Sequence, residues 1–243
     1  MLNQVIQNLD KVKQRITDAA HRSGRLPEAI KLIVVTKGVE VSKIQELIAV
    51  GVTDIGENRI QEAEEKYEII TEKKHGQIKE KYSDNKCQWH LIGHLQRNKV
   101  KSALEMFSLI HSVDSIRLYK EISKRSIDKQ HPIKVLLQVN TTGEESKFGI
   151  GVDEVLTFIQ GTQNYPNVKI CGLMTIGIFS NIPEDNRPVF ELLRKVSDKI
   201  EQEKFDGVEM KYLSMGMTND FEVAIEEGAN LVRIGTAIFN TDN

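Results

Sequence analysis

The sequence contains few cysteines and no long apolar segment. Only Cys87 and Cys171 occur among the 243 residues, too few for the disulfide framework of a small secreted protein, which favours a reducing cytoplasm. No apolar run approaches the roughly 20 residues that a transmembrane helix needs. The opening MLNQVIQNLDKVKQRI spaces its apolar side chains at helical intervals, unlike the unbroken apolar core of a signal peptide. We therefore predict a cytoplasmic protein that begins with an amphipathic helix and has no membrane partner.

The chain also lacks a large excess of charge. Its 33 basic and 35 acidic residues give a formal charge of −2, so nothing in the charge balance calls for nucleic acid or a membrane surface. Arg97, Lys99 and Lys101 have no aromatic residues between them for base stacking and indicate a solvated helix start. His90 and His94 of HLIGH lack the glutamate of a zinc-binding HExxH helix, so we predict no metal site.

What the sequence does contain is a regular alternation of β-rich runs and helical patterns. The predicted strands cover residues 31–36, 52–56, 88–92, 109–113, 134–140, 168–174, 211–214 and 231–234. The predicted helices between them cover residues 42–50, 60–67, 99–106, 116–129, 153–163, 189–204 and 220–227. Eight such units are the number that closes a parallel barrel. We predict one (β/α)8 TIM barrel domain over residues 1–243 with an extra N-terminal helix; a doubly wound open sheet is the alternative.

Local signals support several of these boundaries. Ser42, Ser115 and Asp153 stand where helix N-caps are expected, each shortly before two apolar residues of a predicted helix. Residues 71–86 are charged and nearly free of aliphatic side chains, which indicates a solvated excursion within the barrel. Cys171 lies among apolar strand residues and is interpreted as a small core residue.

The segments after the last two predicted strands carry the first functional signal. SMGMTND and RIGTAIF place glycines and hydroxyls beside expected helix starts. Free N–H groups at helix N-termini attract anions, and the loops after strands seven and eight are the usual phosphate site of a TIM barrel. The pattern favours a phosphate-bearing small molecule, although ordinary turn and capping residues would give the same composition.

Lys37 provides the second functional signal, because it follows the aliphatic run of the predicted strand in LIVVTKG. A lysine at the rim could reach the other end of a ligand whose phosphate sits across the mouth, and desolvation would favour its nucleophilic free amine. A lysine that only reaches into solvent from a strand end is the alternative.

Together these motifs resemble a known family. VVTK, GENRIQE, WHLIGHLQRNK, SKFGI, GLMTIG and YLSMGMTNDFEVAIEEGANLVRIGTAIF are similar, in order and over nearly the whole chain, to the pyridoxal phosphate homeostasis proteins. That family is similar in fold to the N-terminal barrel domain of alanine racemase.

The resemblance implies a cofactor, pyridoxal 5′-phosphate (PLP), and a set of residues that hold it. Lys37 would carry PLP as an imine, and Arg233 would face the pyridine nitrogen. Asn58 would lie near the ring. The phosphate would be held by Ser214, the backbone of Met215, Gly216 and Met217, and by Gly235 and Thr236. His90 and Met174, with the Met217 side chain, would line the pocket. IFN stands where IFG is expected.

Three functions remain open at this point. The first is a PLP-binding protein that holds and releases the cofactor, supports intracellular PLP homeostasis and affects amino-acid and keto-acid pools indirectly. The second is an amino-acid racemase with weak or narrow activity, but the resembling racemases take their tyrosine base from a second, β-rich domain, and we expect no evident source of that base in this sequence. The third is an aldolase-like barrel whose lysine attacks a sugar phosphate. We expect the first, acting as a monomer without robust catalysis, with PLP-dependent apoenzymes as candidate recipients.

Overall fold

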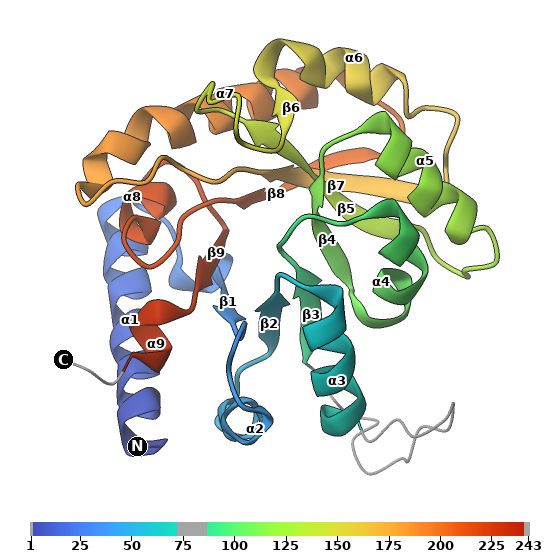
Figure 1. Cartoon of the computed structure of the whole chain (residues 1–243). Coiled ribbons are helices and arrows are strands. Elements are labelled where there is room, and N and C mark those ends of the chain that lie inside the picture. The colour runs from blue at the N-terminus through green and yellow to red at the C-terminus, as the bar shows by residue number, and fades with distance from the viewer. Residues whose placement is uncertain (1, 72–86, 241–243) are drawn as a thin grey trace.

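The computed structural model describes residues 2–71 and 87–240, and within them eight parallel strands close into a barrel surrounded by helices (Figure 1). These strands are β1 (Lys31–Val35), β2 (Asp54–Glu57), β3 (Gln88–Leu91), β4 (Leu109–Val113), β5 (Ile133–Asn140), β7 (Val168–Met174), β8 (Val208–Ser214) and β9 (Leu231–Ile234). Their order is β4-β3-β2-β1-β9-β8-β7-β5, and pairing of β4 with β5 closes the ring. The predicted TIM barrel is confirmed, and the open sheet is excluded.

Helices follow the strands as the sequence predicts. They are α1 (Leu2–Arg22), α2 (Val41–Ala49), α3 (Ile60–Ile70), α4 (Val100–Met106), α5 (Ile116–Arg125), α6 (Val155–Gln160), α7 (Arg187–Glu203), α8 (Phe221–Glu226) and α9 (Thr236–Phe239). Short 3-10 turns lie at η1 (Pro27–Ala29), η3 (Arg97–Lys99), η4 (Val152–Glu154) and η5 (Pro183–Asn186). Three of these turns directly precede α4, α6 and α7, and α4 and α6 accordingly begin later than predicted, at Val100 and Val155.

The N-terminal helix packs beside the last two helices, α8 and α9 (Figure 1). Val5, Leu9, Val12 and Ile16 form its buried stripe, because their three- and four-residue spacing places them on one face. The Asn8 side chain donates hydrogen bonds to the carbonyls of Ile238 and Asn240 at 3.2 and 3.1 Å. The helix therefore lies against the segment that follows β9.

The strands bury two separate apolar surfaces, because successive side chains point to opposite faces of the barrel wall. The larger core lies between the strands and the helices. A smaller cluster occupies the barrel interior and consists of Ile33, Leu109, Leu136, Cys171, Met174 and Leu231. Cys171 is only 3% exposed, which confirms its interpretation as a core residue. Polar side chains fill the rest of the interior, and they are described below.

Some local expectations differ from the structure. Ser115 caps α5 as predicted, since its hydroxyl accepts a hydrogen bond from the Leu118 N–H at 3.4 Å. The Ser42 cap is wrong, because α2 begins one residue earlier, after Glu40. The Asp153 cap is also wrong, because Asp153 lies inside η4, which Gly151 precedes. The sequence did not predict a two-residue strand, β6 (Ile150–Gly151), which pairs in parallel with the last two residues of β5, Val139 and Asn140.

Two further predictions concern parts of the chain beyond the barrel wall. The solvated excursion lies outside the described residues, apart from Thr71. Among the helices of the described chain, none has both the length and the apolar character needed to cross a bilayer.

Candidate functional site

Four neighbouring strands, β2, β1, β9 and β8, bring most of the predicted site residues to one rim of the barrel. Parallel pairing sets Ile33 of β1 opposite Arg233 of β9, and Val35 opposite Gly56 of β2. Lys37 therefore follows β1 between Asn58, which follows β2, and Thr236, which follows β9. The backbone N–H of Arg233 donates to the Gly216 carbonyl at 3.1 Å, which joins the β8 loop to the same edge.

Lys37 is the exposed amine of this rim. It lies in the turn after β1 and is classed as exposed. No hydrogen bond or ion pair engages its side chain within the described part of the chain. A lysine with no partner can meet a ligand without first breaking an ion pair.

The backbone on both sides of Lys37 is held by a buried ionic cluster, the Lys66 cluster, formed by Thr36, Glu57, Glu62 and Lys66. The Lys66 ammonium donates to the Thr36 carbonyl at 2.6 Å, to Glu57 at 2.8 Å and to Glu62 at 2.5 Å. The Thr36 hydroxyl donates to Glu57 at 2.6 Å, and the N–H of Gly38 donates to Glu62. The turn that carries Lys37 is thus tied to β2 and α3.

Two charged side chains of the Lys66 cluster, Lys66 and Glu57, are buried. Lys66 is 6% exposed and Glu57 is fully buried. Burial raises the pKa of Glu57, although hydrogen bonds from Lys66 and Thr36 oppose this. The Oε2 atom of Glu57 and the Oδ1 atom of Asn58 are buried without a hydrogen-bond partner among the described residues, and such atoms are uncommon in native structures. Both lie at the end of β2, beside Lys37.

Arg233 is the buried cation of the site, with an exposed fraction of 4%. Its guanidinium donates to the Ser214 hydroxyl at 2.7 Å and to the Thr175 carbonyl at 2.8 Å. Burial lowers its pKa to about 10, and the nearby Asp220 opposes this, so the group stays protonated at neutral pH. Arginine carries five N–H donors, and the two hydrogen bonds leave the others for a ligand.

The loop after β8 wraps tightly around the start of α8. Gly216 has φ +90°, and a Cβ there would lie 2.6 Å from the Ala224 Cβ, so only glycine fits. The N–H of Met217 donates to the Asp220 carboxylate at 2.6 Å, which occupies one of the donors predicted for phosphate. The Met217 side chain is 41% exposed, whereas the Met215 side chain is buried in the outer core.

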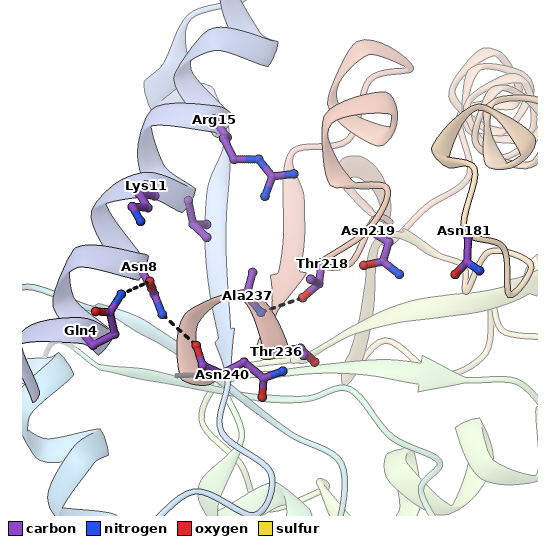
Figure 2. A pocket seen from close by; sticks show the side chains of 11 residues that line it. Gln4, Asn8, Lys11, Arg15, Asn181, Thr218, Asn219, Thr236, Ala237 and Asn240 are labelled. Atoms are coloured by element: carbon purple, nitrogen blue, oxygen red, sulfur yellow. Dashed lines mark hydrogen bonds between the residues drawn. The ribbon is translucent and has the colours of Figure 1, made fainter. Parts of the chain in front are cut away.

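A polar cavity of about 630 Å³ opens beside the ends of β8 and β9. Figure 2 shows Thr218, Asn219, Thr236 and Ala237 on one side, facing α1 residues that include Lys11 and Arg15. The N–H of Ala237 donates to the Thr218 hydroxyl at 3.3 Å, which joins the two loops. Gly235 permits their approach to β1, because a Cβ there would lie 2.9 Å from the Val35 carbonyl oxygen.

Three predicted residues lie deeper than the rim. Met174 belongs to the interior apolar cluster. Ser214 is fully buried, and its hydroxyl contacts Arg233 and the His111 ring rather than open space. His90 is buried between His111 and Asp54. Their predicted contacts with a cofactor stay predictions.

Comparison with known proteins identifies the family. Residues 2–242 match the alanine racemase N-terminal domain family. The chain is 41% identical over 233 residues to the pyridoxal phosphate homeostasis protein of Aquifex aeolicus, covering 96% of each chain. This chain belongs to the pyridoxal phosphate homeostasis protein family.

Solved structures agree with this assignment. PipY of Synechococcus elongatus, whose structure is described as having PLP bound, is 30% identical with a TM-score of 0.77, covering 93% of this chain and 100% of PipY. An alanine racemase of Clostridium difficile is 14% identical with a TM-score of 0.70, covering 99% of this chain and 58% of the racemase. The racemase shares the barrel fold, while members of the homeostasis family match over almost their full length.

The structure places further residues beside those that the sequence predicts for the site. Thr218 and Asn219 line the polar cavity, whereas the sequence prediction includes only the first four residues of SMGMTND. The signal was present in the sequence, since Thr218 belongs to the hydroxyl-bearing SMGMTND loop that precedes an expected helix start. His111 and Lys66 were also missed, because an isolated buried histidine or helical lysine has no sequence signature.

Among the described residues, no group of three or more His, Cys, Asp or Glu side chains could hold a metal ion.

Proposed function

We propose that this chain binds PLP at the carboxyl rim of the barrel, with Lys37 as the attachment point, and contributes to PLP homeostasis in the cytoplasm. The observation that carries the proposal is the position of Lys37, an exposed amine without a partner among the described residues, on a rim shared with the buried cation Arg233. The family membership and the PLP-bound structure of PipY support the same ligand.

The residues present fit this cofactor. Arg233 has donors left for an unprotonated pyridine nitrogen, because arginine donates and never accepts. Asn58 presents a buried oxygen without a partner beside the ring position. The hydroxyls of Thr218 and Thr236 offer donors for an anion. When bound, PLP supplies an aldehyde that reacts with amines and a ring that withdraws electrons.

We favour a holding role over robust catalysis. A pyridine nitrogen that accepts a hydrogen bond from arginine stays unprotonated, so the ring stabilises a carbanion less than it would beside a carboxylate. The names of the relatives support this choice, since they describe homeostasis. An amino-acid racemase with weak activity is the second candidate, favoured by the fold shared with alanine racemase.

The further parts of the proposal concern partners and location. We propose PLP-dependent apoenzymes as recipients of the cofactor, and a monomeric protein. Cytoplasmic location is supported by Cys87 and Cys171, which are both free.

A PLP titration of the purified protein tests the binding proposal. We expect a saturable absorption change in the wild type, reversed by an added amine, and no such change in Lys37→Met. Lys124→Met is the matched control, because Lys124 is exposed on α5, and it should titrate as the wild type does. An equal response in Lys37→Met would contradict Lys37 as the attachment point.

A racemase assay separates the two candidate functions. With PLP-saturated protein and a panel of L-amino acids, we expect no robust formation of D-isomers. Rapid turnover that disappears in Lys37→Met would establish the enzyme instead of the holding protein.

A further inference from the structure

A continuous chain of hydrogen bonds crosses the barrel interior. It consists of Asp54, His90, His111, Ser214 and Arg233, which we call the interior relay. Asp54 contacts His90 Nε2 at 2.8 Å, and His90 Nδ1 contacts His111 Nε2 at 3.0 Å. His111 Nδ1 contacts the Ser214 hydroxyl at 2.8 Å, and Arg233 contacts the same hydroxyl at 2.7 Å. Each of the five residues is buried, with an exposed fraction of 4% or less.

The relay joins the two ends of the barrel. Asp54 is the first residue of β2, and Ser214 is the last residue of β8. In a parallel barrel these positions belong to the amino and carboxyl ends. At the amino end, Asp54 also accepts a hydrogen bond from Lys31, whose side chain is 44% exposed. At the carboxyl end, Arg233 belongs to the proposed PLP site.

The chemistry of arginine sets the direction of every hydrogen bond in the relay. Because Arg233 can only donate, the Ser214 oxygen is an acceptor toward it. The Ser214 hydrogen then has His111 Nδ1 as its acceptor. The proton of His111 must lie on Nε2, where it is donated to His90 Nδ1. The proton of His90 lies on Nε2 and is donated to Asp54. Both rings are neutral in this arrangement, and each of these donors and acceptors is used.

The reverse direction leaves a buried group unsatisfied. If His90 were a cation and His111 carried its proton on Nδ1, the Ser214 oxygen would accept from both His111 and Arg233. The Ser214 hydrogen would then have no acceptor among the described residues, and an unsatisfied buried polar group is costly. Burial, as the largest cause, lowers the pKa of His111 well below its usual value, which agrees with a neutral His111 ring.

We propose that His90 and His111 are positioning residues that connect the Asp54 carboxylate to Arg233 through Ser214, and so hold the guanidinium in place beside the cofactor ring. The role of the relay at the ring rests on the proposed PLP function, whereas its proton arrangement does not. Arg233 has no carboxylate within ion-pair distance in the described chain. The polarised relay gives it an indirect connection to one, and aligned hydrogen bonds strengthen one another in a low-dielectric interior.

The proton arrangement is tested without the cofactor. Nitrogen-15 NMR of histidine-labelled protein at neutral pH distinguishes Nδ1–H, Nε2–H and cationic rings, and His90→Gln and His111→Phe identify the two signals by their loss. We expect both rings to be neutral Nε2–H tautomers. A cationic His90, or an Nδ1–H proton on His111, would overturn the relay. The spectrum of the wild-type protein decides the proton arrangement. Two Nε2–H ring signals in that spectrum support the relay even where a variant fails to fold.

The positioning role is tested with PLP-loaded protein. His111→Phe removes both ring nitrogens and should shift the absorption band of the bound cofactor and weaken its retention by roughly tenfold. Ser112→Ala is the matched control, because Ser112 lies beside His111 on β4 and its hydroxyl donates to the Gly93 carbonyl instead. It should leave both readouts unchanged. Asp54→Asn retains an acceptor without charge and should give an intermediate shift.

The outcomes separate the two proposals. An unshifted band in a folded His111→Phe variant, or an equal shift in Ser112→Ala, would overturn the positioning role while leaving PLP binding intact. A wild-type protein that binds no PLP would overturn the proposed function and, with it, the role at the ring; the NMR result would still decide the proton arrangement.

Discussion

The site contains two lysines near the same turn, and they differ in almost every physical respect. Lys66 is buried, and three oxygen acceptors surround its ammonium. Lys37 is exposed and has no partner among the described residues. A buried ammonium engaged by three oxygen acceptors must break those contacts before it can reach a ligand, whereas an exposed amine without a partner need not. The comparison assigns Lys66 to structure and leaves Lys37 for chemistry.

The two ends of the proposed cofactor are supported in different ways. The Lys66 cluster fixes the turn around Lys37 by ionic hydrogen bonds from β2 and α3. The interior relay fixes Arg233 by neutral histidines inside the barrel. Removing one ion of a buried cluster leaves an uncompensated charge, whereas interrupting a neutral relay leaves only unmatched dipoles. We therefore expect damage to the first network to affect stability more than damage to the second.

The largest expected effect comes from Lys66→Met, which retains the length of the side chain but removes its charge. It leaves the Glu57 carboxylate buried without its cation, so the free energy of unfolding should fall by about 3 kcal/mol, the lower part of the range for broken buried ion pairs. Urea denaturation followed by circular dichroism measures the change.

Lys37→Met is the matched control for this effect. The loss of an exposed, unpaired charge should change the stability by less than about 0.5 kcal/mol. Adding Glu57→Gln to Lys66→Met should recover part of the stability, because the uncompensated carboxylate is then gone. Equal losses in the two single lysine variants would show that the comparison is wrong.

A smaller effect is expected from Arg233→Gln, which keeps an N–H donor but removes the positive charge. Loss of a charge-assisted hydrogen bond to the ring should weaken PLP binding by roughly tenfold, or about 1.4 kcal/mol, and shift the absorption band while covalent attachment at Lys37 persists. A PLP titration monitored by absorbance checks both effects. An unchanged band would argue against the pyridine contact.

The smallest predicted effect is a pH dependence due to His111. Its pKa in the folded protein lies well below the ordinary 6.5, so the unfolded chain takes up this proton first as the pH falls. The associated stability is fully present above pH 6.5 and is lost progressively below it. Between pH 6.5 and 5.5 the loss should be about 1 kcal/mol.

His111→Phe removes this contribution, while the titratable groups outside the interior relay titrate equally in both proteins. The difference in unfolding free energy between wild type and variant should therefore shrink by that amount over the same interval. A difference that stays constant with pH would mean that His111 is not held neutral by the fold.

Much of the fold could be predicted because each unit carries local signals. Apolar runs such as Leu32 to Val35 mark the strands, and periodic apolar residues mark the helices between them. The start of β8 was placed too late, at residue 211 instead of Val208. Exposed and partly buried side chains alternate along β8. The first residues of this strand therefore form no continuous apolar run in the sequence. The β6 strand has only two residues and leaves no periodic signal.

The site was predicted only in part, and the reason is distance along the chain. Lys37 and Arg233 stand in recognisable motifs at strand ends. The contacts that support them join residues far apart in sequence: the Ser214 hydroxyl meets the His111 ring across 103 positions. No local pattern reports such a pairing, because it depends on the closure of the barrel. Thr218 was different, since its position before a helix was visible in the sequence.

The most direct test of the account is to locate the covalently attached lysine. PLP-loaded protein is reduced with borohydride and digested, and the modified peptide is identified by mass spectrometry. The account predicts that the label is on Lys37 and that Lys66 remains unmodified. A label on Lys66 or on another lysine, with Lys37 unmodified, would contradict it.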